Sequence, residues 1–362
     1  MNVRVKLYVG DWYREKTLKS YVFLLYPLWG VVTKASMPYI AAAVTKHRYS
    51  GDEYLFVTDI ADADYVVVPH PIGLFLQANK EKFEKIIAEA RAAKKLILIE
   101  GSGDIETPIE GDDLVILRQS QYRYSAKNNE ITVPLPAEDL CETYFGGRLN
   151  IRKKQPIPVV GFAGWAKLGL KQKIKTYIKS VPLEVVSLFF PHRRAEKKGV
   201  LLRSAALKTL AQTQGIVCNF LGRSSYAGNP VTAQGSMEEN RRQFIENLVD
   251  SDYALCVRGD GNSSIRFYEA LSLGRIPLFL DTACVLPLEN VIDYKKFCVF
   301  VDCKDLHKIG EKLVEFHKKC SPEEFELMQK RAREAYEMYL RPDVFPKHMA
   351  AQLAAYAERY YE

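Results

Sequence analysis

The sequence lacks the marks of a secreted, disulfide-stabilised chain. Its seven cysteines include no CxxC pair, and their number is odd. Several lie in apolar, strand-like runs, where a thiol behaves as a small buried hydrophobe. This usage favours a reducing compartment. The opening residues, Met1–Gly10, are predicted to form a strand and not a secretory signal. We therefore expect a cytoplasmic protein.

Long apolar runs are also missing. The most membrane-like stretch, Tyr21–Val44, is interrupted by Pro27, Lys34 and Pro38. Its uncharged part of about 13 residues is shorter than the roughly 20 that a spanning helix needs. Helices buried in the fold are the favoured interpretation, and a peripheral contact with a membrane surface is the alternative.

Charge of one sign is not concentrated anywhere. The net charge is +7, and no compact Lys/Arg patch with interleaved aromatics occurs, so nucleic acid is not expected as a partner. The short clusters Arg152–Lys154 and His192–Arg194 are typical of solvated loops. A small anionic ligand suits this modest positive balance.

The sequence does have alternating strand-like and helix-like segments, which favour parallel sheets with crossover helices. In the first half, strands are predicted at Val3–Val9, Tyr65–Pro69, Leu96–Glu100 and Leu114–Arg118, with a helix at Glu81–Lys95. In the second half, strands are predicted at Val159–Ala163, Ile216–Phe220, Tyr253–Val257, Ile276–Leu280 and Cys298–Val301. Helices are predicted at Met237–Leu248, Ile265–Leu273, Asp305–Lys318, Glu323–Tyr339 and Pro346–Tyr361. The proline-bearing stretch Arg148–Pro158 separates the halves as a linker.

The most informative segment, Tyr253–Asp281, is predicted to form a strand, a glycine-containing loop, a helix, a glycine stop and a second strand. Ser263 or Ser264 is the expected N-cap, and free N–H groups at that helix start form a natural phosphate site. Gly259 and Gly261 allow close approach of the backbone to a ligand.

Three charged side chains flank this loop. Arg258 precedes it and Arg266 lies in the first helical turn, so both guanidinium groups can reach one anion. Glu269 lies one turn further on and can accept hydrogen bonds from ribose hydroxyls. The alternative is an ordinary surface ion pair between Arg266 and Glu269.

The residues from Arg258 to Pro277, with Phe279–Asp281 and Leu286–Pro287, resemble the conserved block of the exostosin (GT47) glycosyltransferases. Ala63–Pro69 resembles a strand of the same family, and Gly161–Gly164, followed by Arg203, resembles the opening of its C-terminal domain. The likeness covers about residues 55–310 and is strong only within 253–290.

The resemblance implies an α/β protein of the GT-B class. Two Rossmann-like, doubly wound domains would face a central cleft, with C-terminal helices packing back on the N-terminal domain. We predict an acceptor-binding domain at 1–153, a nucleotide-sugar-binding domain at 154–340, and a returning helix at 341–362. The implied reaction is inverting transfer of a sugar, from a nucleotide donor that is usually a uridine diphosphate sugar, to a glycan or glycoconjugate.

The resemblance also implies roles for individual residues. The donor would be bound by Arg258, Gly259, Asp260, Gly261, Asn262, Ser263, Ser264, Arg266 and Glu269. Further contacts to the diphosphate are expected from Lys167, His192, Arg193 and Arg203. No metal or other cofactor is expected, because basic groups and a helix start neutralise the diphosphate in this fold.

The general base should follow a parallel strand of the N-terminal domain, at the edge that faces the crevice. His70 and Asp104 both meet that condition, and a loop histidine bonded only to backbone is the alternative for His70. The Asp62-Ala63-Asp64 triplet resembles a manganese-binding DxD, but carboxylates before a strand are commonly capping or turn residues.

Two other functions stay open at this point. A scaffold without a base would recognise a glycan or nucleotide and catalyse nothing. Another GT-B enzyme would use a GDP- or ADP-sugar. The sugar, the acceptor and the linkage do not follow from these residues.

Overall fold

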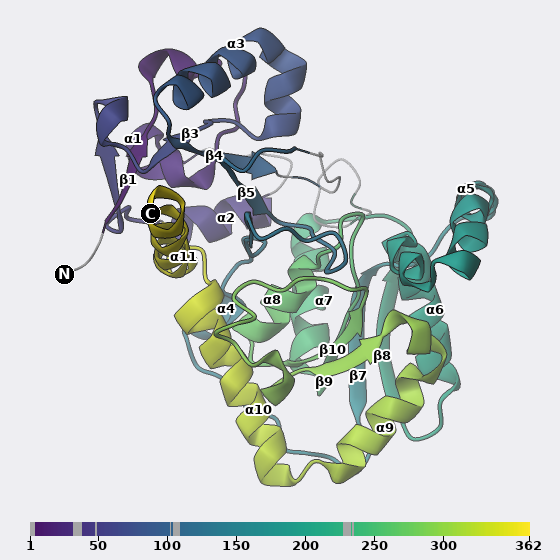
Figure 1. The fold of residues 1–362 in the computed structure, drawn as a ribbon. Helices are drawn as coiled ribbons and strands as arrows, with labels where there is room; N and C mark the ends of the chain where they lie inside the picture. The colour runs from purple at the N-terminus through teal and green to yellow at the C-terminus, as the bar shows by residue number, and fades with distance from the viewer. Residues whose placement is uncertain are drawn as a thin grey trace.

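The computed structural model describes residues 4–31, 38–47, 49–101, 103, 109–226, 233 and 235–362. They form two parallel α/β units, one above the other in Figure 1. Within these residues no helix combines the length and the apolar character needed to cross a membrane.

The first unit is built on a six-stranded parallel sheet with strand order β2-β1-β3-β4-β5-β6. Its strands are β1 (Val5–Tyr8), β2 (Tyr54–Val57), β3 (Tyr65–Val67), β4 (Leu96–Gly101), β5 (Leu114–Arg118) and β6 (Glu130–Thr132). Its helices are α1 (Tyr26–Trp29), α2 (Pro38–Lys46), α3 (Ile72–Ala92) and α4 (Leu140–Phe145). All residues of β3, β4 and β5 are buried, which explains why their sequences are continuous apolar runs.

The second unit has a five-stranded parallel sheet with order β11-β10-β9-β7-β8. Its strands are β7 (Val159–Trp165), β8 (Val217–Arg223), β9 (Tyr253–Cys256), β10 (Ile276–Asp281) and β11 (Val299–Asp302). Its helices are α5 (Leu170–Phe189), α6 (Gly199–Gln212), α7 (Met237–Val249), α8 (Ile265–Ser272), α9 (Ile309–Lys319) and α10 (Pro322–Ala335). In both sheets the chain winds first to one side and then to the other, so each has a point where strand order reverses.

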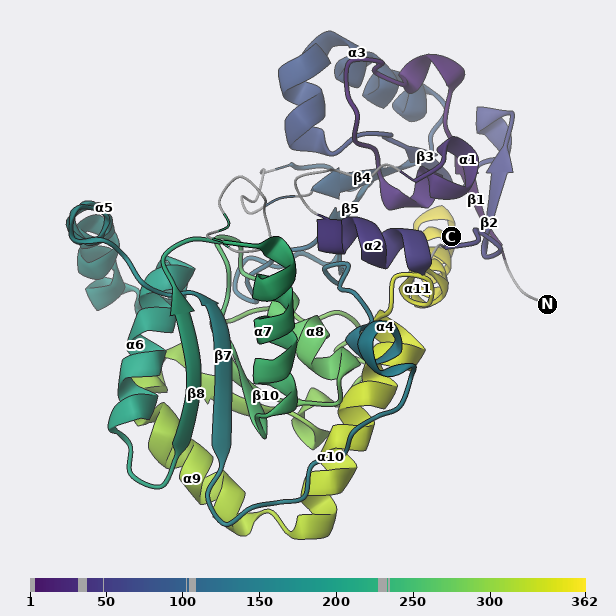
Figure 2. The same ribbon diagram turned by 180° about the vertical axis from the view of Figure 1, so that it is seen from behind.

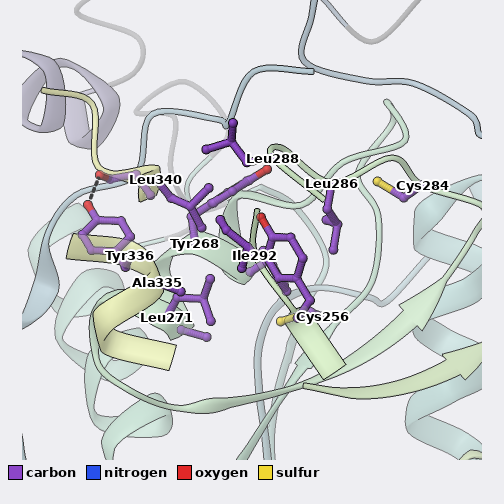
Figure 3. Packing of buried hydrophobic residues seen from close by; sticks show 14 of the residues in the cluster. Cys256, Tyr268, Leu271, Cys284, Leu286, Leu288, Ile292, Ala335, Tyr336 and Leu340 are labelled. Atoms are coloured by element: carbon purple, nitrogen blue, oxygen red, sulfur yellow. Dashed lines mark hydrogen bonds between the residues drawn. The ribbon is translucent and has the colours of Figure 1, made fainter. Parts of the chain in front are cut away.

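The last helix, α11 (Phe345–Tyr361), returns to the first sheet (Figures 1 and 2). The hydroxyl of Tyr54 donates to the carbonyl of Pro346 at 2.8 Å, and that of Tyr65 donates to Leu353 at 2.7 Å. Figure 3 shows Tyr268 of α8 among Tyr336 and Leu340, which precede this return. The predicted fold class is confirmed: two parallel α/β units with a C-terminal helix packed on the N-terminal one. The boundaries 1–153, 154–340 and 341–362 stay predictions, and the first falls in the strand-free stretch before β7.

The first part of the stretch Tyr21–Val44 is built into the fold. Tyr21, Leu24 and Leu25 are buried, and Tyr21 packs edge-on against Trp29. A membrane contact of this stretch therefore has little apolar surface to offer in its first part.

Candidate functional site

A cavity of about 420 Å³ lies at the carboxyl ends of β7 and β8 and beside the loop that follows β9. On the side of the first unit, the cavity is lined by Tyr39 and Ile40 of α2 and by Leu135. Strand order reverses between β7 and β9, which is where open α/β sheets bind their ligands. The volume is within the range of about 300–1,000 Å³ usual for small-molecule sites.

The loop after β9 is folded tightly against the cavity. The N–H of Gly259 donates to the carbonyl of Ser263 at 2.8 Å, and Ser264 is the N-cap of α8. The Ser264 side chain makes no capping hydrogen bond. Gly199, at the start of α6, touches this loop so closely that a Cβ there would lie 2.2 Å from the Gly259 carbonyl oxygen. Glycine at that position is therefore required for the loop to keep its observed place.

Arg266 projects from the first turn of α8 into the cavity. Its guanidinium donates to the carbonyl of Ala163 and lies 4.2 Å from the ring centroid of Phe162. Among the residues that the structure describes, its Nε has no hydrogen-bond partner. Burial lowers the pKa of Arg266, so the protein partly desolvates this cation without pairing it fully.

Arg203 of α6 is a second cation of the cavity lining. It donates to the carbonyls of Trp165 at 3.1 Å and Arg258 at 2.8 Å, and its Nε also lacks a hydrogen-bond partner within the described part of the chain. Burial, together with the nearby charge of Arg266, lowers the pKa of Arg203 to about 10. Both arginines remain protonated at neutral pH, and an anion in the cavity would relieve their mutual repulsion.

Glu269 lines the cavity, and its carboxylate already forms an ion pair with an arginine of the protein. Arg241 of α7 donates to Glu269 Oε1 at 2.7 Å and to Glu138 with its other amino group, and all three side chains are buried. Although burial opposes the charged form, the two carboxylates raise the pKa of Arg241. The ring of Tyr39 lies 4.2 Å from this guanidinium. The surface ion pair with Arg266, offered as the alternative role of Glu269, is therefore replaced by a buried pair with Arg241.

Of the nine predicted donor-binding residues, six line the cavity: Gly259, Asp260, Ser263, Ser264, Arg266 and Glu269. The other three, Arg258, Gly261 and Asn262, are not part of this lining, and their role in donor binding stays a prediction.

Arg258 and Asn262 hold the loop in place instead. The Arg258 guanidinium donates to the hydroxyl of Tyr122 and to the carbonyls of Ala195 and Asp260. The fully buried Asn262 amide donates to the carbonyls of Gln121 at 3.0 Å and Thr282 at 3.1 Å. These bonds connect the loop to Tyr122 and Gln121 of the first unit. The Nε of Arg258 has no hydrogen-bond partner among the described residues.

His70 follows β3 as predicted but is fully buried. Its Nε2 accepts the N–H of Glu15 at 2.9 Å, and its Nδ1 lies 2.6 Å from the carbonyl oxygen of Ser20, to which it donates. Both ring nitrogens are thus used by backbone, and the ring is closed to a substrate. The prediction of His70 as general base is corrected to the alternative, a buried loop histidine. The other candidate, Asp104, lies outside the described residues.

We expect His70→Ala to lower the free energy of unfolding by about 1–3 kcal/mol, because two backbone groups lose their partner. Turnover per folded molecule should stay unchanged. Burial lowers the pKa of His70, so the folded state resists a proton that the unfolded state accepts below pH ~6.5. Wild-type stability should therefore fall as pH drops below that value, and the variant should show a shallower fall. Urea unfolding at several pH values, with turnover assays, tests this; a loss of turnover at full folding would restore His70 as a candidate base.

Of the residues predicted to make further contacts to the diphosphate, some line the cavity and others do not. Arg203 lines the cavity. Lys167 is exposed beside Gly222, and Arg193 is exposed and paired with Glu196 at 2.8 Å, so neither lines it. The side chain of His192 lies outside the part of the chain that the structure describes.

Two carboxylates in and next to the Asp62-Ala63-Asp64 triplet accept hydrogen bonds from the backbone. Asp59 caps a short helix by accepting from the N–H of Ala61 at 2.8 Å, and Asp64 accepts from the N–H of Lys6 at 2.7 Å. These are the capping and turn roles expected as the alternative to a manganese-binding DxD.

One other cluster, away from the cavity, brings together ligand atoms of His47, Asp139 and Glu142. Arg333 donates to both carboxylate oxygens of Asp139, at 2.6 and 3.0 Å, and Lys46 lies 3.4 Å from Glu142. These basic side chains compete with a metal for the carboxylates, so the donor set does not favour a cation.

The structure adds residues to the site that the sequence analysis missed: Tyr39, Trp165, Arg223, Tyr226 and Arg241. Arg223 ends β8 and donates to Gln243 at 3.0 Å. Trp165 ends β7, and its indole Nε1 has no hydrogen-bond partner in the described part of the structure. The position of both at the carboxyl end of a predicted strand was the available signal.

Comparison with known proteins gives a family match that overlaps this site. Residues 181–316 match the family described as Exostosin GT47 domain. The chain is 28% identical to "Probable arabinosyltransferase ARAD1" of Arabidopsis thaliana over 115 residues, which are 32% of this chain and 23% of that protein. It is 30% identical to "Exostosin-1 homolog" of Caenorhabditis elegans over 104 residues, 29% of this chain and 26% of that protein. The matches thus span only about a quarter of these relatives.

Among solved structures, a glycosyltransferase from Rickettsia africae aligns over the full length of both chains, with a TM-score of 0.39 and 10% identity. That degree of likeness supports no conclusion about the site. The family match covers the loop after β9 and helix α8. Residues 181–316 are therefore similar to the Exostosin GT47 domain, and this similarity includes the residues that form one wall of the cavity.

Proposed function

We propose that this protein is a glycosyltransferase that moves a sugar from a nucleotide-sugar donor to a glycan or glycoconjugate acceptor. One observation carries the proposal. Two incompletely paired arginines, Arg203 and Arg266, line a cavity at the N-terminus of α8, where strand order of the second sheet reverses. The GT47 match to the same region supports it.

The diphosphate of the donor fits the basic side of this cavity. Arg266 and Arg203 each keep an N–H that no group of the described residues accepts, and a diphosphate oxygen would supply the missing acceptor. The free N–H groups at the start of α8 add a partial positive charge there. Together they stabilise the charge that develops on the leaving diphosphate.

The acceptor would enter from the side formed by Tyr39, Ile40 and Leu135. In a single inverting displacement, the acceptor oxygen bonds to the anomeric carbon while the bond to the diphosphate oxygen breaks. The hydroxyl proton passes to a general base. Asp104 stays the candidate for that base within the N-terminal unit.

We further propose that the donor carries uridine and that no metal takes part. The arginines can neutralise the diphosphate directly, so a divalent ion is not needed for that task. Two alternatives compete with this proposal: a module that binds nucleotide or glycan without catalysis, and an enzyme that uses a GDP- or ADP-sugar.

Nucleotide binding and donor hydrolysis separate these possibilities. We expect UDP to raise the melting temperature more than GDP, ADP or CMP, since ligand that binds only the folded state stabilises it. Slow hydrolysis of a UDP-sugar without acceptor should continue in EDTA. Binding without hydrolysis or transfer would indicate the non-catalytic module, and preference for GDP or ADP would replace the donor. No stabilisation by any of the four nucleotides would contradict the function itself.

A further inference from the structure

Helix α5 stands apart from the rest of the second unit. Figures 1 and 2 show it at the outer edge of the molecule, away from the faces of both sheets. The element with which it packs most is the adjoining 3₁₀ helix Pro191–Glu196. A helix of 20 residues in such a position is unusual, because tertiary packing normally supplies most of a helix's stability.

A stripe of large apolar side chains on α5 is exposed to solvent. Its members are Ile174 (53% exposed), Ile178 (65%), Val181 (55%), Val185 (52%) and Phe189 (77%). Their spacing of four, three, four and four residues places them on one face of the helix. The stripe runs about 22 Å along the axis, at 1.5 Å per residue. Contiguous exposed apolar surface of this kind marks an interaction site.

The charge of α5 and of the residues that follow it indicates which kind of partner this surface binds. The α5 segment contains four lysines and one glutamate. His192-Arg193-Arg194 and Lys197-Lys198 follow it, with Glu196 between them. Basic residues together with an apolar stripe are typical of helices that lie in the interface of an anionic membrane. The same charge disfavours pairing of α5 with α5 of a second copy, because like charges would meet.

We propose that α5 is a membrane-surface helix, which inserts its apolar stripe among the headgroups of a bilayer that contains anionic lipids. The Tyr21–Val44 stretch, considered above for a peripheral contact, is less suited because much of its apolar surface is buried. The helix follows β7, whose last residue Trp165 lines the cavity. Binding through α5 would hold the cavity near the membrane surface. The inference does not depend on the transfer reaction.

Vesicle co-sedimentation of the full chain tests this. The vesicles are phosphatidylcholine with about 30% phosphatidylglycerol, and phosphatidylcholine alone as the neutral comparison. We expect binding to the anionic vesicles, weakened by salt. The double variant Ile178→Ser/Phe189→Ser should lose at least about tenfold in affinity, since apolar insertion supplies much of the binding energy. The matched control is Leu327→Ser/Met338→Ser, which removes two exposed apolar side chains elsewhere and should bind as wild type does.

Three results would overturn the proposal. Wild-type protein could stay in the supernatant with both kinds of vesicle. The α5 variant could sediment as the control variant does. Analytical ultracentrifugation could show a dimer that the α5 variant abolishes, without vesicle binding, in which case the stripe contacts a second copy. Because both variants leave the cavity untouched, nucleotide binding measured in parallel shows that a failure here leaves the proposed function standing.

Discussion

Arg266→Ala is expected to lose nucleotide-sugar binding by about 10- to 100-fold, the value of one or two charge-assisted hydrogen bonds. Arg266 lines the cavity at the start of α8, and its Nε has no partner among the residues described in the structure. The substitution removes that donor and one of the two positive charges that face the proposed diphosphate. Turnover should fall at least as far as binding, because the charge on the leaving group grows in the transition state. Isothermal titration with UDP and a donor hydrolysis assay measure the two effects.

Arg193→Ala is the matched control for this prediction. Arg193 is an exposed arginine of the same unit, paired with Glu196 and outside the cavity lining. It removes the same net charge from the protein, so a general loss of electrostatic attraction would weaken both variants equally. Circular dichroism and melting temperature show whether Arg266→Ala is folded, since its guanidinium also donates to Ala163. A folded Arg266→Ala that binds donor as tightly as wild type would show that the loop is misassigned.

The loop after β9 could be predicted from sequence because its determinants are local. A buried strand, two glycines, a serine cap and a glycine stop follow one another within 22 residues. The structure has Ser264 as N-cap of α8 and Gly274 just past its end, in the left-handed conformation at φ +61°. The strand Leu114–Arg118 was likewise predicted with its observed bounds, because four apolar residues precede Arg118 and polar residues lie on both sides of the run.

The residues that complete the cavity could not be predicted in this way, because tertiary contacts define them. Arg241 meets Glu138 across 103 residues and Glu269 across 28, and no local pattern connects the three. His70 follows the predicted strand, but its two ring nitrogens bind backbone groups of Glu15 and Ser20, which lie 55 and 50 residues away in the sequence. The sequence thus predicts that a residue lies at the end of a strand, but not whether its side chain points into a cavity or into the core.

The helix α5 is a different kind of omission. No helix is predicted between 164 and 215, where the structure has both α5 and α6. The apolar spacing from Ile174 to Phe189 is helical, and it was available in the sequence. Pro182, inside the helix, interrupts the pattern, because proline normally ends a helix. The exposure of the apolar stripe, which makes α5 a candidate interaction surface, follows only from the fold.

Arg241→Ala is expected to cost about 3–5 kcal/mol of folding free energy, the usual effect of removing one partner from a buried ion pair. The guanidinium lies between Glu138 and Glu269, and all three side chains are more than nine-tenths buried. Without it, two carboxylates face each other in a poorly solvated space. The triad joins the segment that follows the first sheet to α7 and α8, so its loss should also loosen the wall of the cavity.

Arg242→Ala supplies the control, because the neighbouring arginine is exposed and pairs only with Glu239 and Glu246 of its own helix. Such surface pairs contribute little to stability, so this variant should unfold at nearly the wild-type urea concentration. The triple variant Arg241→Met/Glu138→Gln/Glu269→Gln, which carries no charge at these positions, should recover much of the lost stability, since no unpaired charge remains buried. Equal urea midpoints for Arg241→Ala and Arg242→Ala would mean that water or a rearrangement satisfies both glutamates, and the triad would then be no structural link between the two units.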